Sequence, residues 1–472
     1  GTSGNGDILV NDSISWTSNY TLTLAAYRNV TVSAPISLSG STNAALNLYA
    51  NALSASAYTS AGSGSGGIAI NAPVTVSGSA ATVTLNATAI TDISASGITY
   101  GYGGYISYPD VSSSTTGRLT INAQAYTLLS ALAQLDALDG DIASGSGNTA
   151  VASGLHAVTG FYALTQNLTA TDTYYRALVN PNSTFAFSGK FDGLGHTISG
   201  LTINSVLDTS ANLVYTGLFG QVNGSVVNTG LLQANITNKT NLGGALVAYL
   251  AGGGGVYGSY SSGSNSSVGS IRGLGLGGLV GFNYSSTIQN CWSSVSVISS
   301  NATFFSGGLV AYMGGAGASV ANSYASGPVI VLGSASSYVG GLVGYAVTNS
   351  VIRDSYATGF VSGTNIANTT GLATGATSTN AYWNSDTSGN SNGVGIGLHT
   401  TQLQGTLNKL NSSNWGVAPG QYPYQKYLFP QGLQSVSGTA YRADSTTANT
   451  SSAASIVVNL TLNGLAQPKV VA

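Results

Sequence analysis

A glycine-led phrase returns along the second half of this chain at a nearly constant period. Strong copies begin at Gly277, Gly307 and Gly340, which lie 30 and 33 residues apart, and the last copy reads "GGLVGYAVTNSVIRDSYATGFV". Earlier copies begin at Thr216 and Gly243. The phrases are short and strand-like, and none of them is helical. A period near 30 of this kind predicts the stacked coils of a β-solenoid.

Each strong copy opens with Gly-Gly-Leu-Val. In a stacked coil, the Leu-Val pair is expected to face the interior, and glycine is expected at corners where the backbone needs a positive φ or a close approach. The structural repeat residues predicted on this basis are Gly277, Gly278, Leu279, Val280, Gly307, Gly308, Leu309, Val310, Gly340, Gly341, Leu342 and Val343.

The composition supports stacking. Only 5% of the 472 residues are charged, and the acidic residues are thirteen Asp and no Glu. Helical domains need Glu, Lys and Arg on their wet faces, whereas like charges in register on stacked coils would repel one another. The net charge of −2 and the lack of a basic stripe argue against a nucleic-acid partner. The longest apolar run, residues 241–258, is too short and glycine-rich for a membrane span.

Several segments differ from the main repeat. Residues 29–50 match residues 67–88, with apolar and polar residues alternating as in half-buried strands. The segment "YTLLSALAQLDALDGD" (126–141) has leucines at helical spacing and predicts a short helix. The predicted division is β-helix coils at 1–123, a helical insertion at 124–150, repeat coils at 151–410, an aromatic and proline-containing cap at 411–434, and terminal strands of a partial β-module at 435–472. The predicted fold is an all-β, right-handed parallel β-helix.

These phrases resemble the GLUG repeat of bacterial two-partner-secretion exoproteins, the relatives of filamentous haemagglutinin. Further segments are similar to the family in family order, including "GNGDILVNDSISW" at the start, "FSGKFDGLGHTISGLTI" before the repeats and "YPYQKYLFPQGL" after them. The family's amino-terminal secretion domain has no counterpart here, so the chain resembles a processed or partial passenger.

The resemblance implies a protein that is secreted or displayed on the bacterial surface and is not an enzyme. Its expected role is structural and adhesive, as an adhesin stalk, a fibre subunit or a biofilm matrix component. Expected partners are surface glycans or proteins and further copies of the chain in a head-to-tail fibre. Strand addition by a self-association strand containing Ile456, Val457, Val458 and Leu460 is one predicted route to such a fibre.

Parallel β-helices also include polysaccharide lyases and glycosidases, so a polysaccharide-degrading enzyme is the alternative function. Its candidate catalytic residue is Asp192, which lies near Lys190 and His196 in sequence. A non-catalytic glycan-binding module is a second alternative. The structural interpretation of Asp192 is a turn residue next to a glycine. Asp354 aligns with Asn290 and is expected to hold a corner by hydrogen bonds.

No cofactor or metal site is predicted. Cys291 takes the place of Ser323 and Ser355 in the other copies and is expected to be a small buried filler. The histidines His156, His196 and His399 lie far apart in sequence and share no ligand spacing. Residues 386–393 have oxygen side chains at alternate positions but lack the glutamate of a calcium loop, so a polar surface loop is expected.

Overall fold

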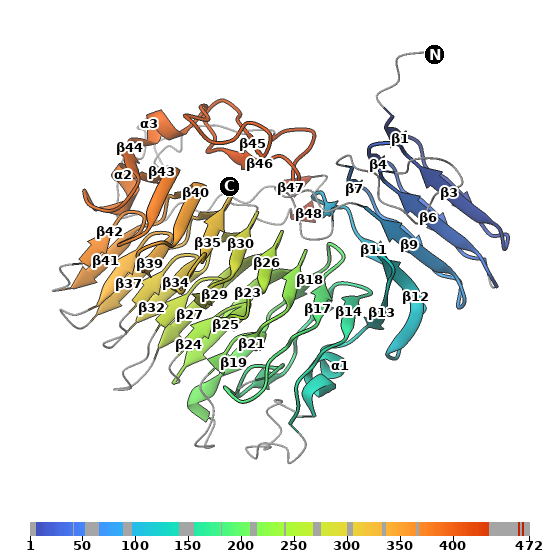
Figure 1. Cartoon of the computed structure of the whole chain (residues 1–472), viewed down its shortest axis with the longest axis horizontal. Helices are drawn as coiled ribbons and strands as arrows, with labels where there is room; N and C mark the ends of the chain where they lie inside the picture. The colour runs from blue at the N-terminus through green and yellow to red at the C-terminus, as the bar shows by residue number, and fades with distance from the viewer. Residues whose placement is uncertain are drawn as a thin grey trace.

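In the computed structural model, short strands stack in parallel and form a curved, elongated β-solenoid (Figure 1). The structure describes residues 6–40, 42–51, 66–87, 97–140, 155–180, 182–207, 215–239, 242–267, 275–299, 305–332, 337–364 and 368–433, together with the backbone of two short strands near the C-terminus. The predicted all-β parallel β-helix is confirmed.

Three parallel sheets form the first part of the solenoid, here called the N-terminal stack. The first sheet contains β1 (Ile8–Val10), β4 (Val30–Val32), β7 (Ile68–Ile70) and β10 (Ile98–Tyr100). The second contains β2 (Ile14–Trp16), β5 (Ile36–Leu38), β8 (Val74–Val76) and β11 (Ile106–Ser107). The third runs through β3 (Thr21–Ala25), β6 (Ala45–Tyr49), β9 (Thr82–Asn86) and β12 (Thr115–Ile121). Strands of the matched segments therefore pair in neighbouring coils: β4 with β7 and β5 with β8 at the offset of the sequence match, and β6 with β9 shifted by one residue.

An antiparallel hairpin joins the N-terminal stack to the rest of the solenoid. β12 pairs with β13 (Gln124–Leu129) across a two-residue turn, in which Asn122 and Ala123 have φ values of 49° and 64°. Positive φ at both positions is typical of the turns that close tight hairpins. Beyond the turn, β13 pairs in parallel with β14 (Phe161–Leu164).

The sheet around this hairpin serves two cores. Leu128 packs with the N-terminal core, while its neighbour Leu129 packs with the core of the following coils. Ala163 and Leu164 on β14 divide in the same way. Successive side chains of a strand point to opposite faces. One face of β13 and β14 therefore packs against the N-terminal core, and the other face packs against the core of the following coils.

This two-sided burial corrects part of the predicted helix. Residues 124–129 are strand β13, and the helical turns are α1 (Leu132–Asp136) and η1 (Ala137–Asp139). Leu128 and Leu129 are apolar because each fills a different core. Together with the leucines of α1 they give the spacing expected for one apolar face of a helix, so the sequence pattern predicted a helix that begins too early. The remainder of the predicted insertion, residues 141–150, lies outside the described residues.

The remaining coils form the repeat stack, whose sheets are also parallel. One sheet contains β20 (Tyr215–Thr216), β24 (Leu242–Gly244), β28 (Gly275–Gly277), β33 (Phe305–Gly307), β38 (Tyr338–Gly340) and β42 (Asn368–Thr370). The next contains β21 (Phe219–Val222), β25 (Val247–Leu250), β29 (Val280–Tyr284), β34 (Val310–Gly314) and β39 (Val343–Ala346).

A longer ladder continues from β14 through β17 (Lys190–Asp192), β22 (Ser225–Val227), β26 (Gly255–Tyr257), β30 (Thr287–Gln289), β35 (Ser319–Ala321), β40 (Val351–Ala357) and β43 (Thr377–Asn384), and β44 (Ile396–Leu398) pairs with the last of these. Beside it lie β15 (Leu168–Thr169), β18 (Thr197–Ser199), β23 (Gly230–Asn238), β27 (Tyr260–Ser267), β31 (Trp292–Ser293) and β36 (Tyr324–Ala325). The coil closes through β16 (Thr173–Tyr174), β19 (Thr202–Asn204), β32 (Ser296–Ser299), β37 (Val329–Leu332) and β41 (Val361–Thr364).

The Gly-Gly pair of the repeat is explained by close backbone approach. At the first glycine, an added Cβ would lie 1.8 to 2.0 Å from the carbonyl oxygen of the valine three residues later, in Gly277, Gly307 and Gly340. At the second, it would lie 2.0 to 2.2 Å from the carbonyl oxygen of the matching glycine in the next coil, in Gly278 and Gly308. The first glycine therefore permits a close backbone approach within one coil, and the second permits a close backbone approach between neighbouring coils.

At the corners of the repeat coils, positive φ, the other expected use of glycine, falls mainly to asparagine. Asn228, Asn290, Asn322 and Asp354 are the corner residues of successive repeat coils and have φ between 47° and 56°. Gly258 takes the same corner, with φ 56°, in the coil between those of Asn228 and Asn290. Asn and Asp tolerate the left-handed region because their short polar side chains bond locally.

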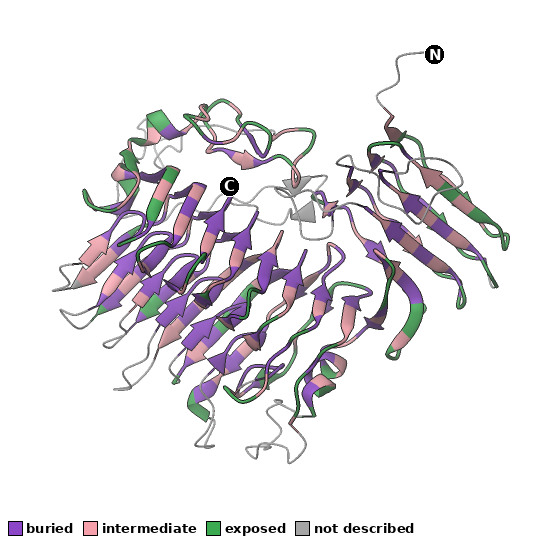
Figure 2. Ribbon diagram, in the orientation of Figure 1, coloured by how far each residue is buried: buried purple, intermediate pink, exposed green. Residues whose placement is uncertain are grey.

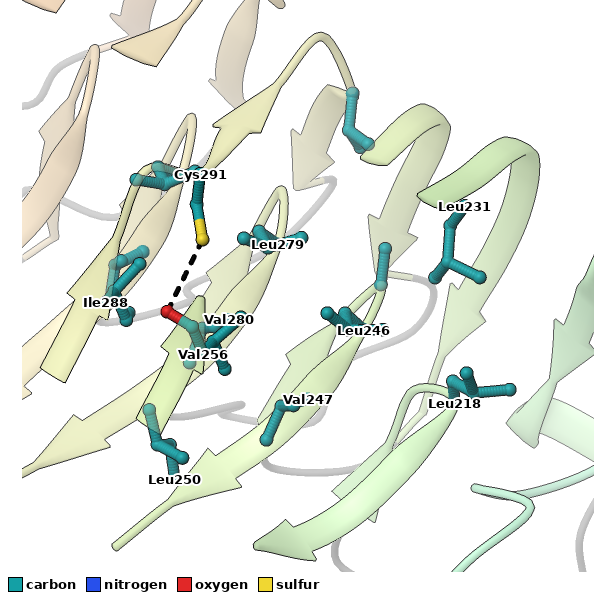
Figure 3. Packing of buried hydrophobic residues seen from close by; sticks show 14 of the residues in the cluster. Leu218, Leu231, Leu246, Val247, Leu250, Val256, Leu279, Val280, Ile288 and Cys291 are labelled. Atoms are coloured by element: carbon teal, nitrogen blue, oxygen red, sulfur yellow. Dashed lines mark hydrogen bonds between the residues drawn. The ribbon is translucent and has the colours of Figure 1, made fainter. Parts of the chain in front are cut away.

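Aliphatic side chains fill the interior of both stacks. The repeat core includes Leu279, Val280, Leu309, Val310, Leu342 and Val343, all fully buried. Figure 3 shows these layers of leucine, valine and isoleucine between neighbouring coils. Figure 2 shows that buried residues alternate with partly exposed ones along most strands, as expected for a solenoid with one buried face.

Candidate functional site

Cys291 lies where the repeat alignment placed it, inside a row of hydroxyl groups. Its backbone N–H donates to Ser323 Oγ (3.1 Å), and the N–H of Ser323 donates to Ser355 Oγ (3.1 Å). The thiol donates to the carbonyl oxygens of Val256 (3.4 Å) and Gln289 (3.2 Å), and the first contact is drawn in Figure 3. Burial raises the pKa of Cys291 to about 12, so the thiol stays protonated and unreactive.

Asp192, the candidate catalytic residue of the alternative function, is fully buried. Its Oδ1 accepts hydrogen bonds from the backbone N–H of Leu194 (2.9 Å) and from Asn228 Nδ2 (3.1 Å). Burial raises the pKa of Asp192, and the nearby Lys190 acts in the opposite direction. These contacts hold the bend between two coils.

His196 joins the two stacks. Its Nε2 donates to the carbonyl oxygen of Ile106 in the N-terminal stack (2.8 Å), and its ring packs against Tyr105 with centroids 5.1 Å apart. Burial lowers the pKa of His196 to about 4, so the ring is neutral at pH 7.

This burial predicts an acid-sensitive junction. The folded pKa of His196 lies below the ordinary value of 6.5, so its contribution is complete above pH 6.5 and is lost as the pH falls toward 4. Between pH 7.5 and 4.5 the wild type is expected to lose about 2–3 kcal/mol more unfolding free energy than His196→Gln. Asp192, whose pKa is raised, partly offsets the loss in both proteins. Urea unfolding at the two pH values measures this difference, and equal losses would contradict it.

Further acidic residues and His156 lie on separate elements. Asp139 is buried in η1 and accepts a hydrogen bond from the backbone N–H of Asn180, whereas Asp141 lies outside the described residues. His156 is exposed. Among the described residues, no group of three or more His, Cys, Asp or Glu side chains could hold a metal ion.

The first residues of the predicted polar loop at 386–393 belong to a short helix. Asp386, in α2 (Ser385–Ser388), faces His399 Nδ1 through Oδ1 (2.6 Å) and accepts the backbone N–H of Thr400 through Oδ2 (2.9 Å). Its hydrogen bond to His399 lowers the pKa of Asp386. The carboxylate thereby caps α3 (Thr400–Leu403).

A row of aromatic rings runs along the outside of the second repeat sheet. Tyr249, Phe282, Tyr312 and Tyr345 are register partners on β25, β29, β34 and β39, and each is half-buried. Their ring centroids lie 5.7, 4.1 and 5.9 Å apart in succession. We call these four residues the outer aromatic row. It offers a continuous, uncharged contact surface across four coils.

A second aromatic pair widens this surface. Phe305 and Tyr338 lie in register on β33 and β38, next to the outer aromatic row. The centroid of Phe305 lies 4.8 Å from that of Tyr312, and the centroid of Tyr338 lies 4.6 Å from that of Tyr345. Rings that contact neighbours in two directions are held in place and lose little freedom when they bind a partner.

A third set of rings, here called the covered row, stacks on another outer face. It comprises Tyr260, Trp292, Tyr324 and Tyr356, with centroids 4.6, 5.9 and 5.2 Å apart and interplanar angles of 5° to 12°. Residues 399–433, here called the strap, run along this row from the C-terminal coils back toward the N-terminal stack (Figure 1).

The strap binds the corner carbonyls coil by coil. Trp415 Nε1 donates to Asp354 O (3.0 Å) and Gln425 Nε2 donates to Asn322 O (2.8 Å). Tyr427 Oη then donates to the carbonyl oxygen of Asn290 (2.8 Å). Each bond satisfies a carbonyl group at a left-handed corner. The short strands β45 (Trp415–Gly416) and β46 (Tyr424–Gln425) form a hairpin within the strap.

The strap differs from the predicted cap in position. The aromatic segment 411–434 was expected to cover the last coil, but its described part lies along the flank of several coils and reaches the N-terminal stack, where Leu428 O accepts the backbone N–H of Tyr102 (2.6 Å). The predicted self-association strand at 456–460 lies outside the described residues, and nearby only β47 (Thr461–Leu462) and β48 (Leu465–Ala466) have a described backbone.

Comparison with known proteins supports the repeat. A family model described as the GLUG motif matches residues 335–362, the copy in which Gly340 stands. A search of curated proteins finds no match. A solved structure from Bacteroides ovatus, described as a candidate immunoglobulin A1 protease, is similar over 64% of this chain and 92% of its own chain, with 16% sequence identity and a TM-score of 0.44. A likeness at that score carries no argument about activity.

The GLUG motif and the β-solenoid together fit an extracellular structural protein. Within the described part of the chain, no helix has the length and apolar character needed to cross a bilayer.

Proposed function

We propose that this chain is a structural and adhesive protein of the bacterial surface, serving as a stalk or matrix component that contacts glycans or proteins through the outer aromatic row. Export by a two-partner-secretion route is part of the proposal. The observation that carries it is the row itself, which spans four coils of a nearly uncharged solenoid.

Physical arguments favour this use of the row. A monomeric protein rarely leaves a contiguous aromatic surface partly exposed without a partner. Parallel ladders hold the rings rigidly, and aromatic side chains supply a large contact area with few rotatable bonds. A stacked solenoid also resists extension along its sheets, because every coil is hydrogen-bonded to the next.

The proposal predicts that protein-coated beads adhere to bacterial lawns or epithelial monolayers more than albumin-coated beads do. Replacing Tyr312 and Tyr345 together with alanine is expected to reduce the number of bound beads by about fivefold or more, since buried aromatic contacts dominate binding surfaces. The matched control is Tyr20→Ala with Tyr27→Ala, two exposed tyrosines of the N-terminal stack (78% and 67% exposed). Thermal unfolding of each variant verifies that the fold is kept.

Two results would count against the proposal. Beads bearing the intact protein that bind no better than albumin beads would remove the adhesive role. Equal adhesion by the Tyr312/Tyr345 variant and the intact protein would remove the outer aromatic row as the contact surface.

A further inference from the structure

A pocket lies next to the part of the corner row that the strap contacts. Over the coils of Asp354, Asn322 and Asn290 the strap covers the corners, but the next corner, Gly258, lines an open pocket of about 350 Å³. Pockets that take small ligands begin at about 300 Å³. This pocket therefore suits one or two rings of a small ligand.

Aromatic rings form two sides of the pocket. On one side are Tyr260 and Trp292, the first members of the covered row, stacked at 4.6 Å. On the other are Tyr102 from the N-terminal stack and Phe429 at the end of the strap, stacked at 5.6 Å. Three segments that are distant in sequence thus meet around one space.

One polar atom without a protein donor also lies at this space. Asn228 is only 5% exposed; its Nδ2 donates to Asp192, and no described residue donates to its Oδ1. Asn228 Oδ1 is therefore an acceptor available to a ligand hydroxyl group. Trp292 contributes its ring to the lining, since its Nε1 is enclosed by other atoms.

The pocket has no charged lining residue. A charged ligand would lose its hydration there without gaining an opposite charge, which disfavours acidic sugars and phosphates. The neighbouring strap contacts show what this groove accepts: flat rings against aromatic faces, and N–H or O–H donors directed at corner oxygens.

We propose that this pocket binds a neutral sugar ring of a surface glycan, with the apolar C–H face of the sugar against Tyr102 or Trp292 and a hydroxyl group donating to Asn228 Oδ1. The proposal deepens the adhesive function proposed above and rests on it, but it uses a different surface from the outer aromatic row.

The test is binding of the intact protein to an array of immobilised neutral and acidic oligosaccharides. Saturable binding to neutral oligosaccharides is expected, and Tyr102→Ala is expected to weaken it about tenfold, whereas Tyr102→Phe keeps the ring and should bind as the intact protein does. Trp292→Ala removes the ring on the other side of the pocket, so it should also weaken binding several-fold, and thermal unfolding verifies that this variant is folded. Tyr20→Ala is the control for an exposed tyrosine outside the pocket.

Each other outcome overturns the inference. Silence across the array, or binding to acidic oligosaccharides alone, excludes a neutral-sugar site. Neutral binding that survives both Tyr102→Ala and Trp292→Ala places the glycan elsewhere. In every one of these cases the bead assay with the Tyr312/Tyr345 variant still decides the adhesive function separately.

Discussion

Gly307→Ala is expected to lower the free energy of unfolding by about 3 kcal/mol, because overpacking in a rigid core typically costs about this much. An alanine Cβ at this position would lie 2.0 Å from the carbonyl oxygen of Val310 and 2.7 Å from the backbone nitrogen of Gly344. Both obstacles are backbone atoms in stacked strands, so neither can rotate away. Relief of the clash requires the coil to move, and each coil is hydrogen-bonded to its neighbours.

Gly317→Ala is the matched control in the same coil. Gly317 has φ 79° and nothing within 4 Å of the added Cβ, so alanine there meets only the strain of the left-handed region, about 1 kcal/mol. Denaturant unfolding of the two variants and the intact protein, followed by circular dichroism, gives the comparison. Equal losses would show that close approach does not explain the first glycine of the repeat.

The repeat made much of the fold predictable. Residues that stack in register occupy the same environment, so alignment of the copies placed Cys291 in the serine row and Asp354 in the asparagine corner row, and the structure confirms both. The alignment was less reliable around Gly243. There the glycine that stacks on Gly277 is Gly244, because the register is fixed by the strand pairing and not by the first glycine of the phrase.

The strap contacts and the pocket could not be predicted from the sequence, for a physical reason. Strap side chains bind main-chain carbonyl groups at the corners of coils 61, 103 and 137 residues away. Every residue has such a carbonyl group, so these acceptors have no sequence signature. The connecting hairpin was missed for a related reason, since its Asn122-Ala123 turn lacks the Asn-Gly pair that usually marks such turns. Its conformation is imposed by the two paired strands.

Trp415→Ala is expected to cost about 3–5 kcal/mol of unfolding free energy, as truncation of a buried aromatic residue usually does. Trp415 is fully buried, its ring centroid lies 5.4 Å from that of Tyr356, and its Nε1 donates to Asp354 O. Its loss removes packing against the covered row and leaves a corner carbonyl without its donor. If the strap detaches before the coils unfold, limited proteolysis should show faster cleavage within residues 399–433 in the variant.

Trp415→Phe separates the two contributions. Phenylalanine keeps most of the packing against Tyr356 but cannot donate to Asp354, so its cost should be about 1 kcal/mol for the lost hydrogen bond plus a small packing loss. Denaturant unfolding and proteolysis of both variants provide the measurement. Phe429, which lines the pocket, belongs to the same strap as Trp415, so loss of Trp415 reaches the pocket only if the strap contacts form cooperatively. In that case Trp415→Ala should also weaken glycan binding at the pocket. Unchanged unfolding and cleavage in Trp415→Ala would mean that the strap contributes nothing to the stability of the solenoid.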